Sequence, residues 1–243
     1  GLTGKPAIKE VRFVDAGRLS DPPAEFRGDR LHVLPDVPTA ELGRYETEAK
    51  AGGRVKVVTA AHPREVCVLA VNHRRPALRS ADLRRGLSLA IDREKLLTDV
   101  FRAGRPQLHR ALAGPFPPDC WATPRPGGQR PDPLFNRDLA AAKLKAYRDA
   151  GGADVLTLAF PDDDPQAKMA CERIRDDVAA TGAGPKRELL PLPPAELHRA
   201  TVEQQRFDLA YLPFDYRDDW YPLRLAAFLD PLAAAPGGRN VCG

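Results

Sequence analysis

The order of apolar and polar residues in the second half of the chain predicts alternating strands and helices. Short segments at 155–160, 187–190 and 207–212 predict strands. A helix that begins at Pro165 and ends at Gly182 separates the first two segments, and a helix over 194–204 separates the last two. Strands and helices of these lengths indicate a right-handed parallel βαβαβ unit.

The first half of the chain predicts further strands, which differ in how many of their faces are covered by other parts of the protein. Residues 8–14 alternate between apolar and charged side chains, which predicts a strand with one wet face. Residues 30–34 and 55–59 also predict strands, and a short helix begins at Pro38. The run 66–71 is almost entirely apolar, so we expect a central strand covered on both faces.

Side chains that accept hydrogen bonds at helix starts predict where four helices begin. Ser80, Asp92, Asn136 and Asp164 each precede a segment with helical spacing of apolar residues. A last helix is expected over 220–229. Each of these capping residues therefore marks the point where a predicted strand or loop ends and a helix begins.

Composition narrows the class of protein. The chain has 243 residues, 43% of them hydrophobic, which is enough for one sizeable core or two small ones. The net charge is only +4, and the arginines are spread along the chain instead of forming a basic patch. No nucleic-acid partner is therefore expected. The sequence contains no run of 18 apolar residues, so no membrane-spanning helix is predicted. Many of the 25 prolines lie in 106–133, which predicts a Pro-rich irregular arm over 105–135.

The residue types that carry catalysis or bind metals lack the expected spacing. The four cysteines form no CxxC pair, and the five histidines form no HxH or HxxxH pair, so no metal or other cofactor is predicted. Cys67 and Cys171 are expected to be buried, whereas Cys120 and Cys242 lie in loops where a disulfide is an alternative. No nucleophile elbow or phosphate-binding glycine loop is present, so we expect no enzyme activity, although residues of a triad can come from distant segments.

Acidic residues follow two of the predicted parallel strands. Asp162 and Asp163 follow the strand at 155–160, and Asp215 and Asp218 follow the strand at 207–212. Ligands bind outside the carboxyl ends of strands in open α/β sheets, so these carboxylates are candidates for attracting a cationic group. For the first pair, solvation beside the capping Asp164 is the alternative.

Aromatic residues near these acids are candidates for lining a pocket. Tyr216 follows Asp215 directly, Tyr211 lies on the preceding strand, and Trp121 lies in the Pro-rich arm. For Trp121 the alternative is that it anchors the arm onto the body of the protein.

Residues 68–97 carry a resemblance to a known family. An apolar strand ends at Asn72, a Pro-containing loop follows, and a helix leads into the phrase Ala-Ile-Asp-Arg-Glu-Lys at 90–95. This order resembles the signature of the peptide- and nickel-binding solute receptors of bacterial ABC importers, extracellular solute-binding protein family 5. The acidic loop from Pro213 to Pro222 adds to the resemblance, which extends from about residue 8 to residue 240.

The resemblance implies a fold and a function. The expected fold is α/β, a periplasmic-binding-protein-like lobe of type II with a mixed sheet and flanking helices. Residues 1–243 would form a single C-terminal lobe of a two-lobe receptor, without the family's N-terminal lobe and returning tail. Its partners would be a peptide or similar small solute, the missing lobe and a membrane permease, in a periplasmic or extracytoplasmic location, with a membrane anchor possible in the full protein.

The resemblance also assigns roles to site residues. Asp215 resembles the aspartate that pairs with the amino terminus of a peptide ligand in peptide-binding relatives. The segment 161–165 reads Pro-Asp-Asp-Asp-Pro where dipeptide-binding relatives place an arginine for the ligand carboxylate. This departure argues against a free dipeptide and fits a longer peptide, a cationic ligand or a receptor that no longer serves import. A sensor module fused to a kinase or a DNA-binding domain is the alternative function.

Overall fold

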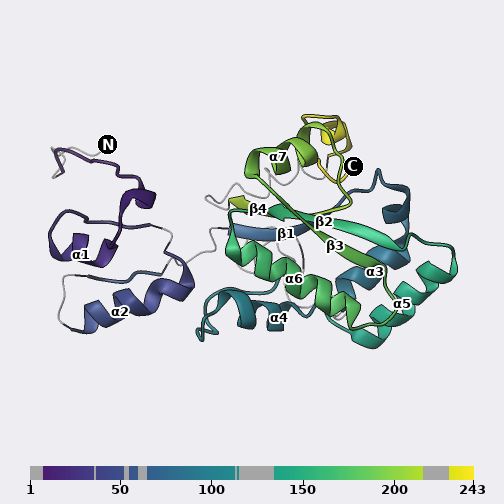
Figure 1. Cartoon of the computed structure of the whole chain (residues 1–243), viewed down its shortest axis with the longest axis horizontal. Helices are drawn as coiled ribbons and strands as arrows, with labels where there is room; N and C mark the ends of the chain where they lie inside the picture. Colours follow the sequence, from purple (N-terminus) through teal and green to yellow (C-terminus); the bar gives the residue numbers. More distant parts are fainter. Residues whose placement is uncertain are drawn as a thin grey trace, which may run out of the picture. The chain divides into compact units, whose positions relative to one another are not determined.

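The computed structural model describes residues 8–35, 37–51, 55–59, 65–112, 114, 134–215 and 230–243. The chain divides into two compact units, Gly1–Thr59 (unit 1) and Ala60–Gly243 (unit 2). Figure 1 shows the elements of both units in the colours of the sequence.

Unit 1 contains short helices and extended segments. Its helical elements are η1 (Ala16–Arg18), α1 (Pro22–Arg27), η2 (Thr39–Glu41) and α2 (Leu42–Lys50). The rings of Phe26 in α1 and Tyr45 in α2 meet edge to face with centroids 6.5 Å apart. The strands predicted over 8–14, 30–34 and 55–59 are not formed, because none of these segments pairs with a described neighbouring strand.

Unit 2 is built on a mixed four-stranded sheet with the order β1-β4-β2-β3. Its strands are β1 (Glu65–Val71), β2 (Val155–Pro161), β3 (Lys186–Leu192) and β4 (Leu209–Asp215). β2 pairs in parallel with both β3 and β4, which confirms the predicted parallel unit, and β1 pairs antiparallel to β4. The expectation of a central strand at 66–71 was wrong, because β1 lies at one end of the described sheet.

Helices cover both faces of this sheet. The helical elements are η3 (Pro76–Arg79), α3 (Ala81–Ala90), α4 (Arg93–Leu96), η4 (Leu97–Phe101), α5 (Arg137–Asp149), α6 (Pro165–Ala179), α7 (Pro194–His198), η5 (Arg199–Glu203) and η6 (Pro231–Ala234). In Figure 1, α3, α4, α5 and α6 lie on one side of the sheet and α7 lies on the other. The predicted helix over 220–229 falls outside the described residues.

All four predicted caps are confirmed. Ser80, Asp92 and Asn136 each accept a hydrogen bond from a backbone N–H three residues later. Asp164 accepts from the N–H groups of Gln166 and Ala167 and precedes Pro165 at the start of α6. These bonds satisfy N–H groups that the first helical turn leaves without partners.

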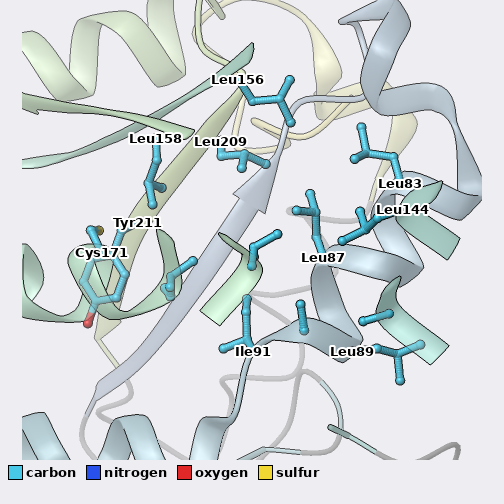
Figure 2. Close-up of a cluster of buried hydrophobic side chains, with 14 of the residues drawn as sticks. Leu83, Leu87, Leu89, Ile91, Leu144, Leu156, Leu158, Cys171, Leu209 and Tyr211 are labelled. Atoms are coloured by element: carbon cyan, nitrogen blue, oxygen red, sulfur yellow. The ribbon is translucent and has the colours of Figure 1, made fainter. Parts of the chain in front are cut away.

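The larger core cluster lies between the sheet and the helices α3, α5 and α6. Figure 2 shows Leu83 and Leu87 of α3 and Leu144 of α5 beside the sheet residues Leu156 and Leu209. The helices approach closely at Gly86, where an added Cβ would lie 2.6 Å from Leu144 Cγ. A smaller cluster on the opposite face contains residues of α7, the sheet and the C-terminal segment.

The turn after β1 holds the C-terminal segment against the sheet. The fully buried Asn72 donates its amide N–H groups to the carbonyls of Gln205 and Phe207, both at 2.9 Å. Arg74 donates to the carbonyls of Asn240 and Val241 at 3.1 and 3.0 Å. The segment 230–243 is therefore part of the fold of unit 2.

The cysteines differ partly from expectation. Cys171 is buried on α6 as predicted, whereas Cys67 is exposed on the terminal strand β1, so its predicted burial was wrong. Cys242 carries a free thiol, so the structure does not contain the alternative disulfide with Cys120, which itself lies outside the described residues.

Candidate functional site

The carboxyl ends of the parallel strands bring two predicted acidic positions to the same edge of the sheet. In the register of β2 and β4, Ala159 lies beside Ala210. Asp162 follows β2 three residues beyond this pair, and Asp215 ends β4 five residues beyond it in the same direction. We call this edge, with Asp162, Asp163 and Asp215, the acidic edge.

Local structure explains why Asp162 and Asp163 remain available at this edge. The Asp162 backbone N–H donates to the carbonyl of Leu192 at 2.9 Å, which ties the ends of β2 and β3 together. Asp164 is used as the cap of α6. Asp162 and Asp163 are exposed, and neither side chain forms a hydrogen bond or ion pair with a described residue. Two carboxylates therefore face solvent beside the end of β2.

Antiparallel pairing adds a further acid to this edge. Glu65, the first residue of β1, lies directly opposite Asp215 in the register with β4. Glu65 is exposed, and its Oε1 lies 3.5 Å from the Cys67 Sγ. Sequence reasoning missed Glu65 because only the antiparallel pairing places the start of β1 beside the end of β4.

Other predicted site residues cannot be placed at the edge. Trp121, Tyr216 and Asp218 lie outside the described residues, and for Asp215 the backbone alone is described. Tyr211 is 6% exposed and belongs to the core cluster, which also contains Cys171 (Figure 2).

The described residues include a buried thiol on α6 and exposed carboxylates at the acidic edge. Burial raises the pKa of Cys171 to about 12, so this thiol stays protonated at neutral pH. Within the described residues, no group of three or more His, Cys, Asp or Glu side chains has a geometry that would hold a metal ion. The acidic edge offers fixed negative charge, which attracts ammonium or guanidinium groups.

The opposite edge of the sheet has a different character. A depression of about 670 Å³ lies at the amino ends of the parallel strands, lined by residues that include Arg75, Tyr147, Val155 and Asp208. Arg75 Nε donates to Asp208 Oδ1 at 2.7 Å, and Thr157 donates its N–H and hydroxyl to Asp208 Oδ2. Arg75 and Asp208 are thus paired with each other, whereas Asp162 and Asp163 have no ion pair with a described residue.

A comparison with known protein families shows which family the chain belongs to. The family model described as "Bacterial extracellular solute-binding proteins, family 5 Middle" matches residues 2–228. The chain belongs to this family. The match confirms the resemblance found at residues 68–97 and the α/β fold expected from it.

Solved structures agree with this fold at low sequence identity. CtaP, an ABC transporter substrate binding protein from Listeria monocytogenes, has a TM-score of 0.67 and 14% identity, and the match covers 90% of this chain and 41% of CtaP. NikA from Brucella suis, in complex with Fe(III)-EDTA, has a TM-score of 0.66 and 15% identity, with 90% and 43% covered. The oligopeptide-binding protein AppA from Bacillus subtilis, in complex with a nonapeptide, has a TM-score of 0.59 and 14% identity, with 82% and 40% covered.

The comparisons also show how long the chain is relative to the matched structures. The family-5 chain described here spans about two fifths of the length of these structures. A comparison with curated protein sequences gives no match. Among the described helices, none combines the length and the apolar character needed to cross a membrane.

Proposed function

We propose that residues 1–243 are part of the solute receptor of an ABC importer and contain the C-terminal lobe that binds a peptide or similar small solute. Membership in the family and the likeness to receptors such as AppA and CtaP support this proposal. The receptor would work outside the cytoplasm and deliver its ligand to a membrane permease by closure of two lobes, without chemistry. The matched family and the solved structures named above do not support the alternative of a fused signalling protein.

The observation that carries the proposal is the shared edge of β2 and β4. Parallel pairing brings Asp162, Asp163 and Asp215 to the end of the sheet where ligands bind in open α/β folds. Asp162 and Asp163 lack ion pairs with described residues, so their charge is available to a ligand. We propose that Asp215 pairs with the ligand's amine, and that Tyr216, Asp218 and Trp121 line the same site.

The sequence around the edge restricts the ligand. The Pro-Asp-Asp-Asp-Pro segment at 161–165 has no cation for a ligand carboxylate, and its acids would repel one. The proposed ligand is therefore a longer peptide or another solute with a free amine near this edge, and a free dipeptide is disfavoured.

A binding experiment with paired ligands tests the role of Asp215. We expect Asp215→Ala, made in the full-length receptor, to weaken binding of an amine-bearing peptide by about 1–3 kcal/mol, the cost of removing a charged hydrogen-bond partner. Calorimetry with the same peptide in free and N-acetylated form measures this loss, with the peptide chosen by mass spectrometry of what co-purifies.

The paired ligands also supply the controls. The N-acetylated peptide should bind the variant and the native receptor alike, because it lacks the charge that Asp215 recognises. Asp176→Ala removes an exposed carboxylate of α6 that pairs with Arg175 away from the edge, and it should leave both affinities unchanged. Equal affinity of the native and Asp215→Ala receptors for the free-amine peptide would remove Asp215 from the site.

A further inference from the structure

The strand β3 has a hydrogen-bonded neighbour on one side and an open edge on the other. Among the described strands, β3 pairs with β2 alone, at the end of the sheet (Figure 1). An open strand edge presents backbone groups that the strand of another molecule can bind. The residues that direct their N–H groups to this edge therefore decide how readily a second strand adds there.

Two hydrogen bonds show which residues of β3 face β2. The Lys186 N–H donates to the carbonyl of Asp154 at 2.7 Å, and the Leu192 carbonyl accepts from the Asp162 N–H at 2.9 Å. Within a strand, the N–H and C=O of one residue point to the same side, and successive residues alternate between the two sides. The even-numbered residues of β3 therefore bind β2, and the odd-numbered residues face the open edge.

Prolines occupy several of the positions that face the open edge. Pro191 is the last odd-numbered residue of β3, and Pro185 and Pro193 come directly before and after the strand with the same alternation. Proline has no N–H group, so it fits a strand where its nitrogen faces away from the ladder. The outward N–H groups within β3 are those of Arg187 and Leu189, and neither forms a backbone hydrogen bond with a described residue.

The half of the strand that contains Pro191 is apolar. At the start of β3, Lys186 and Glu188 form an exposed ion pair at 3.7 Å. The sequence then reads Leu-Leu-Pro-Leu over 189–192, and Leu190 is 42% exposed. An apolar run on an open edge favours edge-to-edge association unless a charge or a proline interrupts it. Pro191 is the residue that interrupts this run.

We propose that Pro191 prevents β3 from pairing with the same strand of a second copy of the protein. A second copy is the relevant partner because each copy presents the same edge, and two identical strands in antiparallel orientation are self-complementary. Without an N–H at Pro191, the outward row of donors ends before the apolar half of the strand. This role of Pro191 does not depend on the ligand or on the proposed function, because it concerns only the sheet edge of unit 2.

Hydrogen exchange of the native protein tests whether the edge is open. In the full-length protein, we expect the amides of Arg187 and Leu189 to exchange on the order of 100-fold faster than those of Glu188 and Leu190, which face β2. Equal protection of all four amides would show that another segment covers the edge, and it would overturn the proposal.

A substitution at Pro191 tests its role directly. Pro191→Val restores an outward N–H and adds a side chain that favours strands. We expect the full-length variant to shift to a species of twice the native mass in sedimentation velocity as its concentration rises, with the Leu189 amide becoming protected. Pro231→Val, which replaces an exposed proline at the start of η6, is the control and should sediment like the native protein. Native sedimentation of Pro191→Val at all concentrations would overturn the proposal.

A second variant at the same position distinguishes edge pairing from misfolding. Pro191→Lys also removes the proline and restores the N–H, but it places a charge on the edge, and an edge lysine opposes pairing. We expect Pro191→Lys to keep the native mass and both variants to keep the folded circular dichroism signal. Association of Pro191→Lys to the same extent, or loss of the folded signal in Pro191→Val, would assign the association to misfolding and overturn the proposal.

Discussion

Units 1 and 2 differ in how much apolar surface each buries around its extended segments. In unit 2, β1 pairs with β4 and β2 pairs with β3 along their lengths, β2 also pairs with β4 at Leu158 and Ala159, and core clusters cover both faces of the sheet. In unit 1, the extended segments pair with no described strand, and Phe13 is 93% exposed. The comparison teaches that an alternating pattern makes a segment able to form a strand, whereas a neighbouring strand decides whether it does.

The largest expected effect contrasts a core residue of unit 2 with an exposed one of unit 1. Leu158 is fully buried in β2. We expect Leu158→Ala to lower the free energy of unfolding by about 2–5 kcal/mol, because a cavity replaces the contacts of the leucine side chain. Phe13→Ala in the same chain should stay within about 0.5 kcal/mol. Urea unfolding followed by circular dichroism measures both; a comparable loss for Phe13→Ala would show that unit 1 buries this residue by itself.

Replacing a buried arginine of unit 2 should stabilise the protein. Arg187 of β3 is 4% exposed, its Nε and Nη1 have no hydrogen-bond partner among the described residues, and burial lowers its pKa to about 10. It stays charged at neutral pH, so Arg187→Met should raise the free energy of unfolding by about 1–4 kcal/mol. The exposed neighbour Lys186→Met is the control in the same denaturation assay. Destabilisation by Arg187→Met would show that the guanidinium has a partner in solution.

The smallest expected effect concerns Asp208, which pairs with Arg75 in unit 2. Burial by itself raises the pKa of Asp208, but hydrogen bonds from Thr157 and Arg75 outweigh it and hold the pKa below the ordinary 3.8. The ionised carboxylate therefore stabilises the fold above that pH, and its contribution is lost as pH falls through the lowered pKa.

We expect Asp208→Asn to destabilise unit 2 by about 1–3 kcal/mol at pH 7, because two donors lose a charged acceptor. This difference should shrink as the pH falls below 3.8, since the native aspartate then becomes protonated. Thermal unfolding from pH 7 to pH 2 measures it, with Asp176→Asn on the surface of α6 as a control. A difference that stays constant over this range would contradict the charge-based account.

The positions of Asp162, Asp163 and Asp215 at the acidic edge followed from the sequence, whereas that of Glu65 did not. The runs before Asp162 and Asp215 predicted two parallel strands, and parallel strands end at one edge, as the structure shows. Glu65 did not follow, because its place depends on the antiparallel pairing of a strand far away in the sequence. The ligand roles of Asp162, Asp163 and Asp215 stay predictions, as do those of Trp121, Tyr216 and Asp218.

Four helix starts could be located from the amino-acid sequence alone. Helix starts at Ser80 and Asp164 depend on a side chain and N–H groups within three residues, so local sequence was sufficient to locate them. The positions that depend on distant partners could be read only from the three-dimensional fold: the place of β1 at one end of the described sheet, the burial of Arg187 and the lack of strand pairing between residues 8–14 and other described residues. The physical reason is that a helix completes its hydrogen bonds within itself, whereas a strand needs another strand to complete them.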